Sequence, residues 1–113
     1  MQLFPFQELD VYRASKALAK LVIEAQIGDA ELRDHATRAA KSVFLNVAEG
    51  LPQRSKAIRR RRFETARDSL GETVAAVDLA EVEGAISEAH VAAVGALAVR
   101  LWPMLHGLLR PLR

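Results

Sequence analysis

A dense run of basic residues between positions 54 and 67 is the part of this sequence best suited to chemistry. It holds seven bases against the single acid Glu64, and residues 68–84 then carry five acids and no base. Arginine presents forked N–H donors that match the geometry of a phosphate group. Contact with a nucleic-acid backbone is therefore the functional hypothesis for the seven bases, which are Arg54, Lys56, Arg59, Arg60, Arg61, Arg62 and Arg67.

The order of these charges opposes helix stability. The segment begins with its cations and ends with its acids, whereas a helix dipole favours the reverse order. Two interpretations stay open: the run is a solvated face, because four adjacent arginines spread over a full helical turn, or it is a phosphate-contacting surface. Phe63 falls on the core stripe, so no aromatic residue is interleaved for base stacking. Binding should then be phosphate-driven, weakly sequence-specific and strongly salt-dependent.

A second group of polar residues lies beside the expected core. Ser42, Asn46 and Glu49 are spaced four and three residues apart, so they share one helix stripe. Ser69 and Thr73 adjoin the core stripe of the following helix, with Glu72 further round. We interpret these residues as a structural polar network, in which Ser42, Asn46, Glu49, Ser69 and Glu72 fix the register of the helices. The alternative is a pocket for a small molecule or phosphate, and the charge of Glu49 argues against an anionic ligand.

Signatures of catalysis and of metal binding are missing from the sequence. It has no cysteine, so thiol chemistry and Cys-based metal sites are excluded. None of the three histidines has a glutamate three positions earlier, which a di-metal helical bundle requires. There is also no Gly-x-Ser-x-Gly elbow and no Gly-rich phosphate loop. We therefore predict a protein that is not an enzyme and that uses no metal and no cofactor.

Hydrophobic periodicity predicts four helices, over about residues 7–26, 30–50, 55–83 and 87–110. Pro103 is expected to kink the last helix or to end its regular part. No segment shows the two-residue alternation of a strand, and the connections are short. The predicted fold class is thus an all-α, antiparallel up-down-up-down four-helix bundle, in a single domain of residues 1–113. The second helix is apolar on more than one side, which indicates that it is central or packs against another subunit.

The composition is that of a folded protein, with half of the residues apolar, 27% charged and a net charge of +2. The first ten residues lack the basic region and the apolar core of a secretion signal. The longest stretch without Asp, Glu, Lys or Arg is Ala89–Val99, about half of what a membrane span needs. We expect a cytoplasmic protein with no membrane contact.

Several segments together carry a family resemblance. They are FQELDVYRASKAL, RAAKSVFLNVAEG, the basic loop with Arg54 and Ser55, and FETARDSLGE. Over about residues 4–110 the chain resembles the four-helix-bundle proteins encoded in 23S rRNA intervening sequences of bacteria, and it is similar to the accessory variability determinant of diversity-generating retroelements. The most specific part is the set Ser42, Asn46, Glu49, Gly50, Arg54, Ala66, Ser69, Leu70 and Glu72. Asp68 departs from the glycine expected before the Ser-Leu pair.

The resemblance implies a homopentamer, shaped like a barrel or funnel, with a positively charged surface that binds RNA or DNA. In the retroelement branch that surface also meets a reverse transcriptase. An oligomer agrees with the second apolar side of the helix at 30–50. The leading hypothesis is a non-enzymatic, oligomeric, nucleic-acid-binding bundle. The alternative is a protein–protein scaffold or adaptor in which the arginines aid solubility or pair with an acidic partner.

Overall fold

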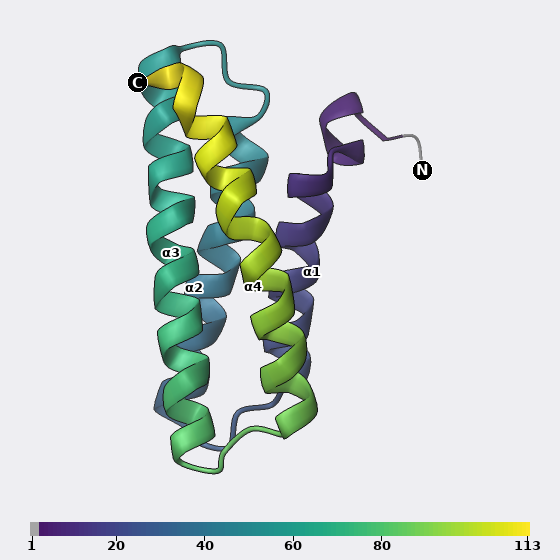
Figure 1. Cartoon of the computed structure of the whole chain (residues 1–113), viewed down its shortest axis with the longest axis vertical. Helices are drawn as coiled ribbons and strands as arrows, with labels where there is room; N and C mark the ends of the chain where they lie inside the picture. The colour runs from purple at the N-terminus through teal and green to yellow at the C-terminus, as the bar shows by residue number, and fades with distance from the viewer. Residues whose placement is uncertain (1–2) are drawn as a thin grey trace.

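The computed structural model describes residues 3–113 and consists of helices (Figure 1). Two short 3₁₀ turns, η1 (Pro5–Glu8) and η2 (Arg110–Leu112), flank the long helices. No residue in 3–113 belongs to a β-strand, so the predicted all-α class is confirmed. The four long helices are α1 (Asp10–Glu24), α2 (Ala30–Gly50), α3 (Lys56–Val82) and α4 (Glu88–Leu109).

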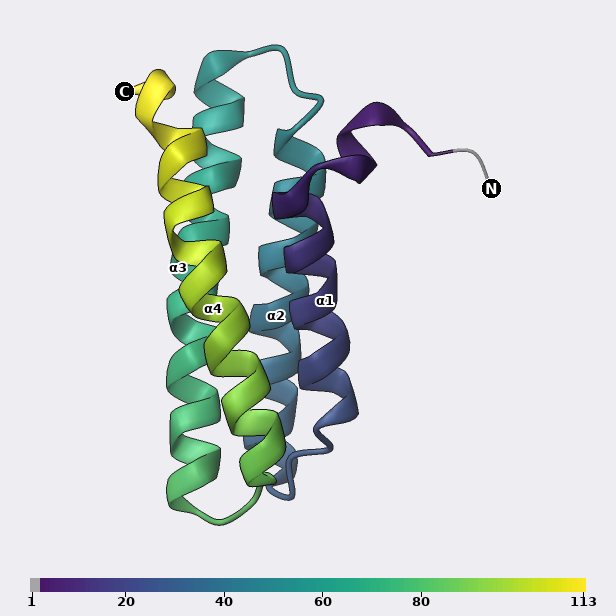
Figure 2. The same ribbon diagram turned by 45° about the vertical axis from the view of Figure 1, so that its right-hand side comes forward.

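Each long helix packs against the next in the chain, and α4 also packs against α1. Figures 1 and 2 show successive helices running in alternating directions, with their connections at alternate ends. This is the arrangement expected of an up-down-up-down bundle. As a consequence, the loop between α2 and α3 lies at the same end of the molecule as the C-terminus (Figure 1).

Side-chain caps define three of the helix starts. The Asp29 carboxylate accepts the Leu32 N–H (3.0 Å) at the start of α2. The Ser55 hydroxyl accepts the Ile58 N–H (3.3 Å) at the start of α3, and Ser87 caps α4 in the same way. Such caps satisfy backbone donors that have no partner within the helix. They also account for the close agreement between predicted and observed bounds of these three helices.

The first helix is shorter than predicted. The prediction of 7–26 placed its start within η1, but Leu9 is extended (φ −70°, ψ 142°) and separates the 3₁₀ turn from α1. At the other end, Gln26 adopts a left-handed conformation (φ 49°), so α1 ends at Glu24. Of the two outcomes expected at Pro103, a kink or an end to the regular part of the last helix, the second does not occur. Pro103 is exposed on α4, which continues to Leu109.

The core runs the length of the bundle and is built from the predicted apolar stripes. Its largest fully buried side chains include Phe63, Leu18, Ile27, Leu70 and Leu101. The segment Glu88–Leu112 is long and apolar enough to cross a membrane by length and composition alone. In the bundle it supplies core residues that pack against α1 and α3, and its other apolar residues are partly buried or exposed.

A close contact between α2 and α3 fixes where the basic segment lies. A Cβ atom placed on Gly50, the last residue of α2, would lie 2.6 Å from the Phe63 ring. Only glycine leaves room for the two helices to approach this closely. Phe63 itself is fully buried, so its neighbours in sequence, Arg59–Arg62, are carried at the end of the bundle beside the α2–α3 loop.

Candidate nucleic-acid interface

Basic side chains gather at one end of the bundle, where the α2–α3 loop, the first turns of α3 and the C-terminal turn η2 meet (Figure 1). We call this the basic end. Antiparallel packing brings the chain's last residues beside the start of α3 although they are about fifty positions apart in sequence. The residues that define the basic end are Arg54, Lys56, Arg59, Arg60, Arg61, Arg62, Arg67, Arg110 and Arg113.

Four of the seven predicted phosphate-contacting residues are held by neighbours within the chain. The Arg62 guanidinium lies 3.0 Å from the Glu49 carboxylate at the end of α2. Arg60 lies 3.5 Å from Glu64, one turn further along α3. Arg59 lies over the Phe63 ring, 5.4 Å from its centroid, which is within cation–π range.

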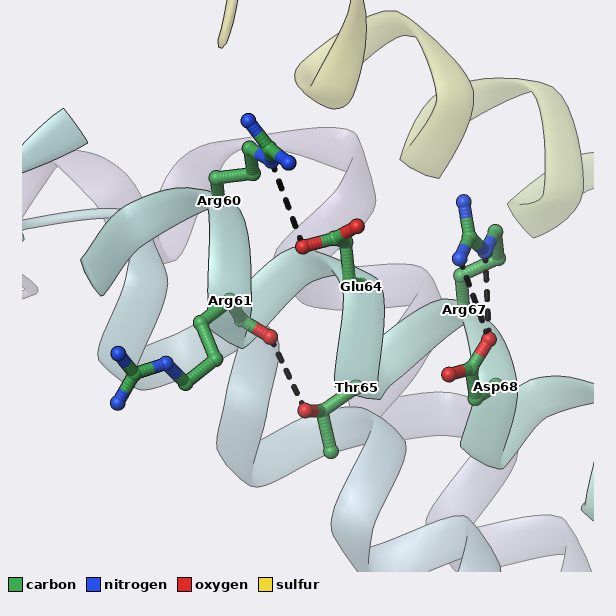
Figure 3. A network of polar contacts seen from close by, with 6 residues as sticks. All are labelled: Arg60, Arg61, Glu64, Thr65, Arg67 and Asp68. Atoms are coloured by element: carbon green, nitrogen blue, oxygen red, sulfur yellow. Dashed lines mark hydrogen bonds and ion pairs between the residues drawn. The ribbon is translucent and has the colours of Figure 1, made fainter. Parts of the chain in front are cut away.

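Arg67 contacts Asp68, the next residue along α3, at 3.3 Å (Figure 3). Asp68 is the acid that stands where the family resemblance favours glycine. These pairs are partly or largely exposed, so each stabilises the fold by only about 0–1 kcal/mol. They orient the guanidinium groups without burying them.

The remaining three predicted residues, Arg54, Lys56 and Arg61, are exposed and form no ion pair with any acid in residues 3–113. Arg61 points away from Arg60 and Arg67 (Figure 3), and its backbone carbonyl accepts the Thr65 hydroxyl at 3.0 Å. The four adjacent arginines thus spread around α3, as the sequence predicted. The structure divides the predicted set into an oriented group and an outward-facing group.

Two basic residues of this end were missed by the sequence analysis. Arg110 and Arg113 are exposed, and η2, which precedes Arg113, packs against α3 as well as α4. A search for local charge runs passes over them because they are isolated in the sequence. The up-down-up-down topology was the available signal, since it places the end of the fourth helix beside the start of the third.

The predicted polar network is present in part. The Ser42 and Ser69 hydroxyls hydrogen bond across α2 and α3 at 2.7 Å. Asn46 Nδ2 donates to the Ser42 hydroxyl (3.1 Å) and to its carbonyl (2.9 Å). Glu49 joins the two helices through Arg62 instead. Among residues 3–113 Glu72 is exposed and takes part in no hydrogen bond or ion pair, so its inclusion in the network was wrong.

Thr73, which also adjoins the core stripe of α3, belongs to the network. Its side chain is fully buried, and its hydroxyl donates to the Ser69 carbonyl at 2.8 Å. Thr73 lies four residues after Ser69 and so falls on the same stripe of the helix. Glu72 is rotated about 100° from Thr73 around the helix axis. A short chain of hydrogen-bonded side chains therefore runs from α2 into α3. Because the chain is so short, we assign it a structural role.

The model of the 23S rRNA-intervening sequence protein family matches residues 7–107. The chain belongs to this family. The matched residues contain all seven predicted bases and the polar set that joins α2 and α3. No curated protein matches the chain significantly.

In this 23S rRNA-intervening sequence family member, the end of the bundle opposite the basic end is acidic. We call it the acidic end, and its acids are Asp29, Glu31, Asp34, Asp78, Glu81, Glu83 and Glu88. Partial desolvation and the neighbouring Asp29 carboxylate raise the pKa of Glu83. Among residues 3–113 no group of three His, Asp or Glu side chains is arranged to hold a metal ion.

A third feature is an apolar hollow of about 490 Å³ on the outer face of α3 and α4. Gly71 on α3 and Gly95 on α4 leave the space, and Leu70, Val74 and Ala98 also line it. At its rim Val99 is 75% exposed and Trp102 is 46% exposed. Exposed apolar surface of this kind marks contact sites more often than single exposed residues do.

Proposed function

We propose that this protein binds RNA or DNA through the backbone phosphates, using the basic end as its contact surface, and that it acts as a cytoplasmic, non-enzymatic, oligomeric protein. The observation that carries the proposal is the group of bases that the fold leaves without partners. Arg54, Lys56 and Arg61 project from one end of the bundle, and no acid in residues 3–113 neutralises them. The family's name, which refers to rRNA intervening sequences, agrees with a role connected to nucleic acid.

Helix energetics support a functional reason for these charges. Cations in the first turns of α3 face the positive end of its dipole, and this costs a few tenths of a kcal/mol for each exposed charge. The core contacts of Phe63 and the Ser55 cap hold α3 in place without them. Phosphate binding accounts for an arrangement that folding alone disfavours.

The contacts expected at this surface read backbone phosphates rather than base sequence. No aromatic side chain is exposed among the arginines, because Phe63 is fully buried. Stacking on unpaired bases is therefore not expected, and a duplex is the natural probe. Each phosphate that is neutralised releases counterions, so affinity should fall linearly on a log–log plot against salt concentration.

The test is a salt series of fluorescence anisotropy with labelled RNA and DNA duplexes. Wild-type protein should bind at low salt and lose affinity steeply, and replacement of Arg59–Arg62 by Ala should flatten the slope. The matched control removes four exposed bases of α1 and α2 that lie outside the basic end, namely Lys16, Lys20, Arg38 and Lys41. It should leave the slope near the wild-type value. Absence of wild-type binding at low salt would overturn the proposal.

Loss of folding is not expected to confuse this test. The surface ion pairs of Arg60 and Arg62 contribute about 0–1 kcal/mol each, so the free energy of unfolding should change little in the Arg59–Arg62→Ala variant. Urea unfolding followed by circular dichroism measures this change for the variant and for the matched control.

The apolar hollow on α3 and α4 favours a second candidate function, a protein-contact surface. The contact would be with further copies of this chain, as in the homopentamer that the family resemblance implies, or with a protein such as a reverse transcriptase. Light scattering should give a mass near five times 12.4 kDa. Trp102→Glu in the hollow should reduce that mass, whereas Val82→Glu, at a position 82% exposed on the acidic end, should not.

A strict monomer would contradict the oligomer. If the protein were monomeric and also failed to bind a duplex, the scaffold or adaptor function would be favoured over nucleic-acid binding. The two properties are measured separately, so either can fail while the other stands.

A further inference from the structure

A small cleft at the basic end brings Arg113 together with two arginines of α3 that come about fifty positions earlier in the sequence. It has a volume of about 230 Å³ and lies between α3 and the C-terminal turn η2. Arg60, Glu64 and Arg67 line it from α3, and Leu109 and Arg113 line it from the end of the chain. We propose that this cleft is a phosphate-binding site, in which Arg60, Arg67 and Arg113 hold one phosphate of the bound nucleic acid.

The two α3 arginines reach the cleft because of their spacing. Arg60 and Arg67 are seven residues apart, which is close to two helical turns, so they project from the same face of α3. Figure 3 shows both side chains on the side of α3 that faces the pale-yellow C-terminal ribbon, whereas Arg61 points away. Glu64 lies on the same face between them.

The third arginine is positioned by the end of the chain. Leu109 is buried, and Leu112 is partly buried against the core, so η2 is anchored at both its ends. The Arg113 N–H lies 3.5 Å from the Arg110 carbonyl, which continues the turn. Arg113 therefore reaches the cleft from an anchored segment. Residues 108–113, Arg113 among them, lie outside the part of the chain that the family model matches.

The contacts already made in the cleft leave its donors largely available. Arg60 Nε lies 3.5 Å from Glu64 Oε1, and two nitrogens of Arg67 lie 3.3 and 3.4 Å from Asp68 Oδ1. Charge-assisted pairs of this type are usually about 2.7–2.9 Å long, so both pairs are loose. Arg113 makes no ion pair with an acid in residues 3–113.

The charge balance of the cleft suits a phosphate. Three guanidinium groups line the cleft with the carboxylate of Glu64, and the Asp68 carboxylate contacts Arg67, which leaves a net charge of about +1. Each guanidinium offers five N–H donors in a planar fork that matches phosphate oxygens. The cleft has room for the ligand with several waters, since one water takes about 30 Å³ of liquid volume. Glu64 is the group that a phosphate would displace from Arg60.

This site rests on the proposed nucleic-acid binding. It predicts that the cleft contributes more of the binding affinity than the other bases of the basic end do. Two variants with the same charge change separate the cleft from its surroundings. The cleft variant carries Arg60→Gln, Arg67→Gln and Arg113→Gln, and the outer variant carries Arg54→Gln, Lys56→Gln and Arg61→Gln. Affinity for a 16-base-pair RNA duplex and its salt dependence are measured for both by anisotropy.

The cleft variant should lose roughly tenfold more affinity than the outer variant, because its donors converge on one ligand. The slope of log affinity against log salt concentration reports how many phosphates are neutralised, at about 0.9 for each phosphate of a duplex. Three arginines that share one phosphate should therefore lower the slope by about 0.9, whereas three dispersed bases should lower it more. Glu64→Gln should tighten binding severalfold. Equal losses of affinity and slope in the two variants would overturn the cleft while leaving the proposed function intact.

A second measurement does not depend on duplex binding. Inorganic phosphate is added to the wild-type protein, and the arginine Nε–Hε signals are followed by NMR. Saturable shifts at Arg60, Arg67 and Arg113 in the wild-type protein, and loss of the shifts at Arg60 and Arg67 in Arg113→Gln, support the site. This single exposed substitution leaves folding unaffected. If wild-type protein binds neither the duplex nor phosphate, both the cleft and the proposed function are wrong; if it binds phosphate alone, the cleft stands as a site for free phosphate.

Discussion

The basic end and the acidic end of this bundle are closed by similar internal contacts but carry opposite surface charge. At the basic end, Phe63 is fully buried against Gly50. At the acidic end, Ile27 is fully buried, and the Gly28 N–H donates to the Ala85 carbonyl at 2.8 Å, which ties the two loops together. The core is continuous between them, so we expect neither end to depend on its charged residues to fold.

This comparison of the two ends separates the buried contacts that the fold needs from the surface charges that each end carries in addition. Acids at the acidic end suit the starts of α2 and α4, where Asp29 is a cap and Glu88 lies in the first turn. They do not suit the end of α3, and the arginines do not suit its start. Helix α3 therefore carries an unfavourable charge order at both of its ends, and the proposed phosphate binding would account for the arginines at its start.

The largest expected effect tests whether the two ends are equally supported by the core. Phe63→Ala should lower the free energy of unfolding by about 3–5 kcal/mol, and Ile27→Ala by about 2–5 kcal/mol, because each leaves a cavity. Urea unfolding at pH 7 measures both. A loss below about 1 kcal/mol for Phe63→Ala would mean that the arginines, rather than the core, hold the basic end together.

A smaller effect concerns the close contact between Gly50 and Phe63 at the basic end. Gly50→Ala places a methyl group 2.6 Å from the Phe63 ring, so α2 and α3 must separate or the ring must move. Overpacking of this kind should cost about 1–3 kcal/mol. Gly28→Ala is the control at the acidic end, since its Cβ would lie in ordinary contact with Ala85 at 3.6 Å or more. Equal stability of Gly50→Ala and wild type would contradict the close approach.

Much of this structure could be predicted from the sequence, because the decisive signals are local. Apolar periodicity predicted three helices with nearly correct bounds, and in the structure the caps Asp29, Ser55 and Ser87 fix where they start. The predicted first helix was too long because the backbone conformations of Leu9 and Gln26 interrupt it. Neither position holds a Gly or Pro that would indicate the interruption in the sequence.

The candidate site was predicted less completely. The charge run showed the bases of α3 but not which of them are paired, since Glu49 reaches Arg62 from another helix. Arg113 was missed because its place beside Arg60 and Arg67 depends on tertiary packing. Glu72 was wrongly added to the polar network because one residue of rotation on α3 separates it from the buried Thr73.

The smallest expected effect is at the acidic end. Partial desolvation and the Asp29 carboxylate raise the pKa of Glu83, so the folded protein holds this proton more tightly than the unfolded chain does. Ionised Glu83 therefore destabilises the fold above its folded pKa, and stability is regained as the pH falls through it. Glu83→Gln should slightly raise the unfolding temperature at pH 7 and leave it unchanged at about pH 3, where the carboxyl is protonated in both states.

The control for that small effect is Glu81→Gln, which removes a carboxylate from the same end of α3. Scanning calorimetry at the two pH values measures both variants. If the helix dipole alone were responsible, the two substitutions would stabilise the protein equally at pH 7. A larger gain for Glu83→Gln identifies the contact with Asp29.

The most direct test of nucleic-acid binding at the basic end neutralises acids rather than bases. One variant carries Glu49→Gln, Glu64→Gln and Asp68→Asn at the basic end, and the other carries Asp78→Asn, Glu81→Gln and Glu83→Gln at the acidic end. Both raise the net charge by three. Exposed charge contacts are worth about 0.2–1 kcal/mol each, so the first should bind an RNA duplex roughly tenfold more tightly than wild type. The second should bind like wild type; equal tightening by both would mean that net charge, and not the basic end, governs binding.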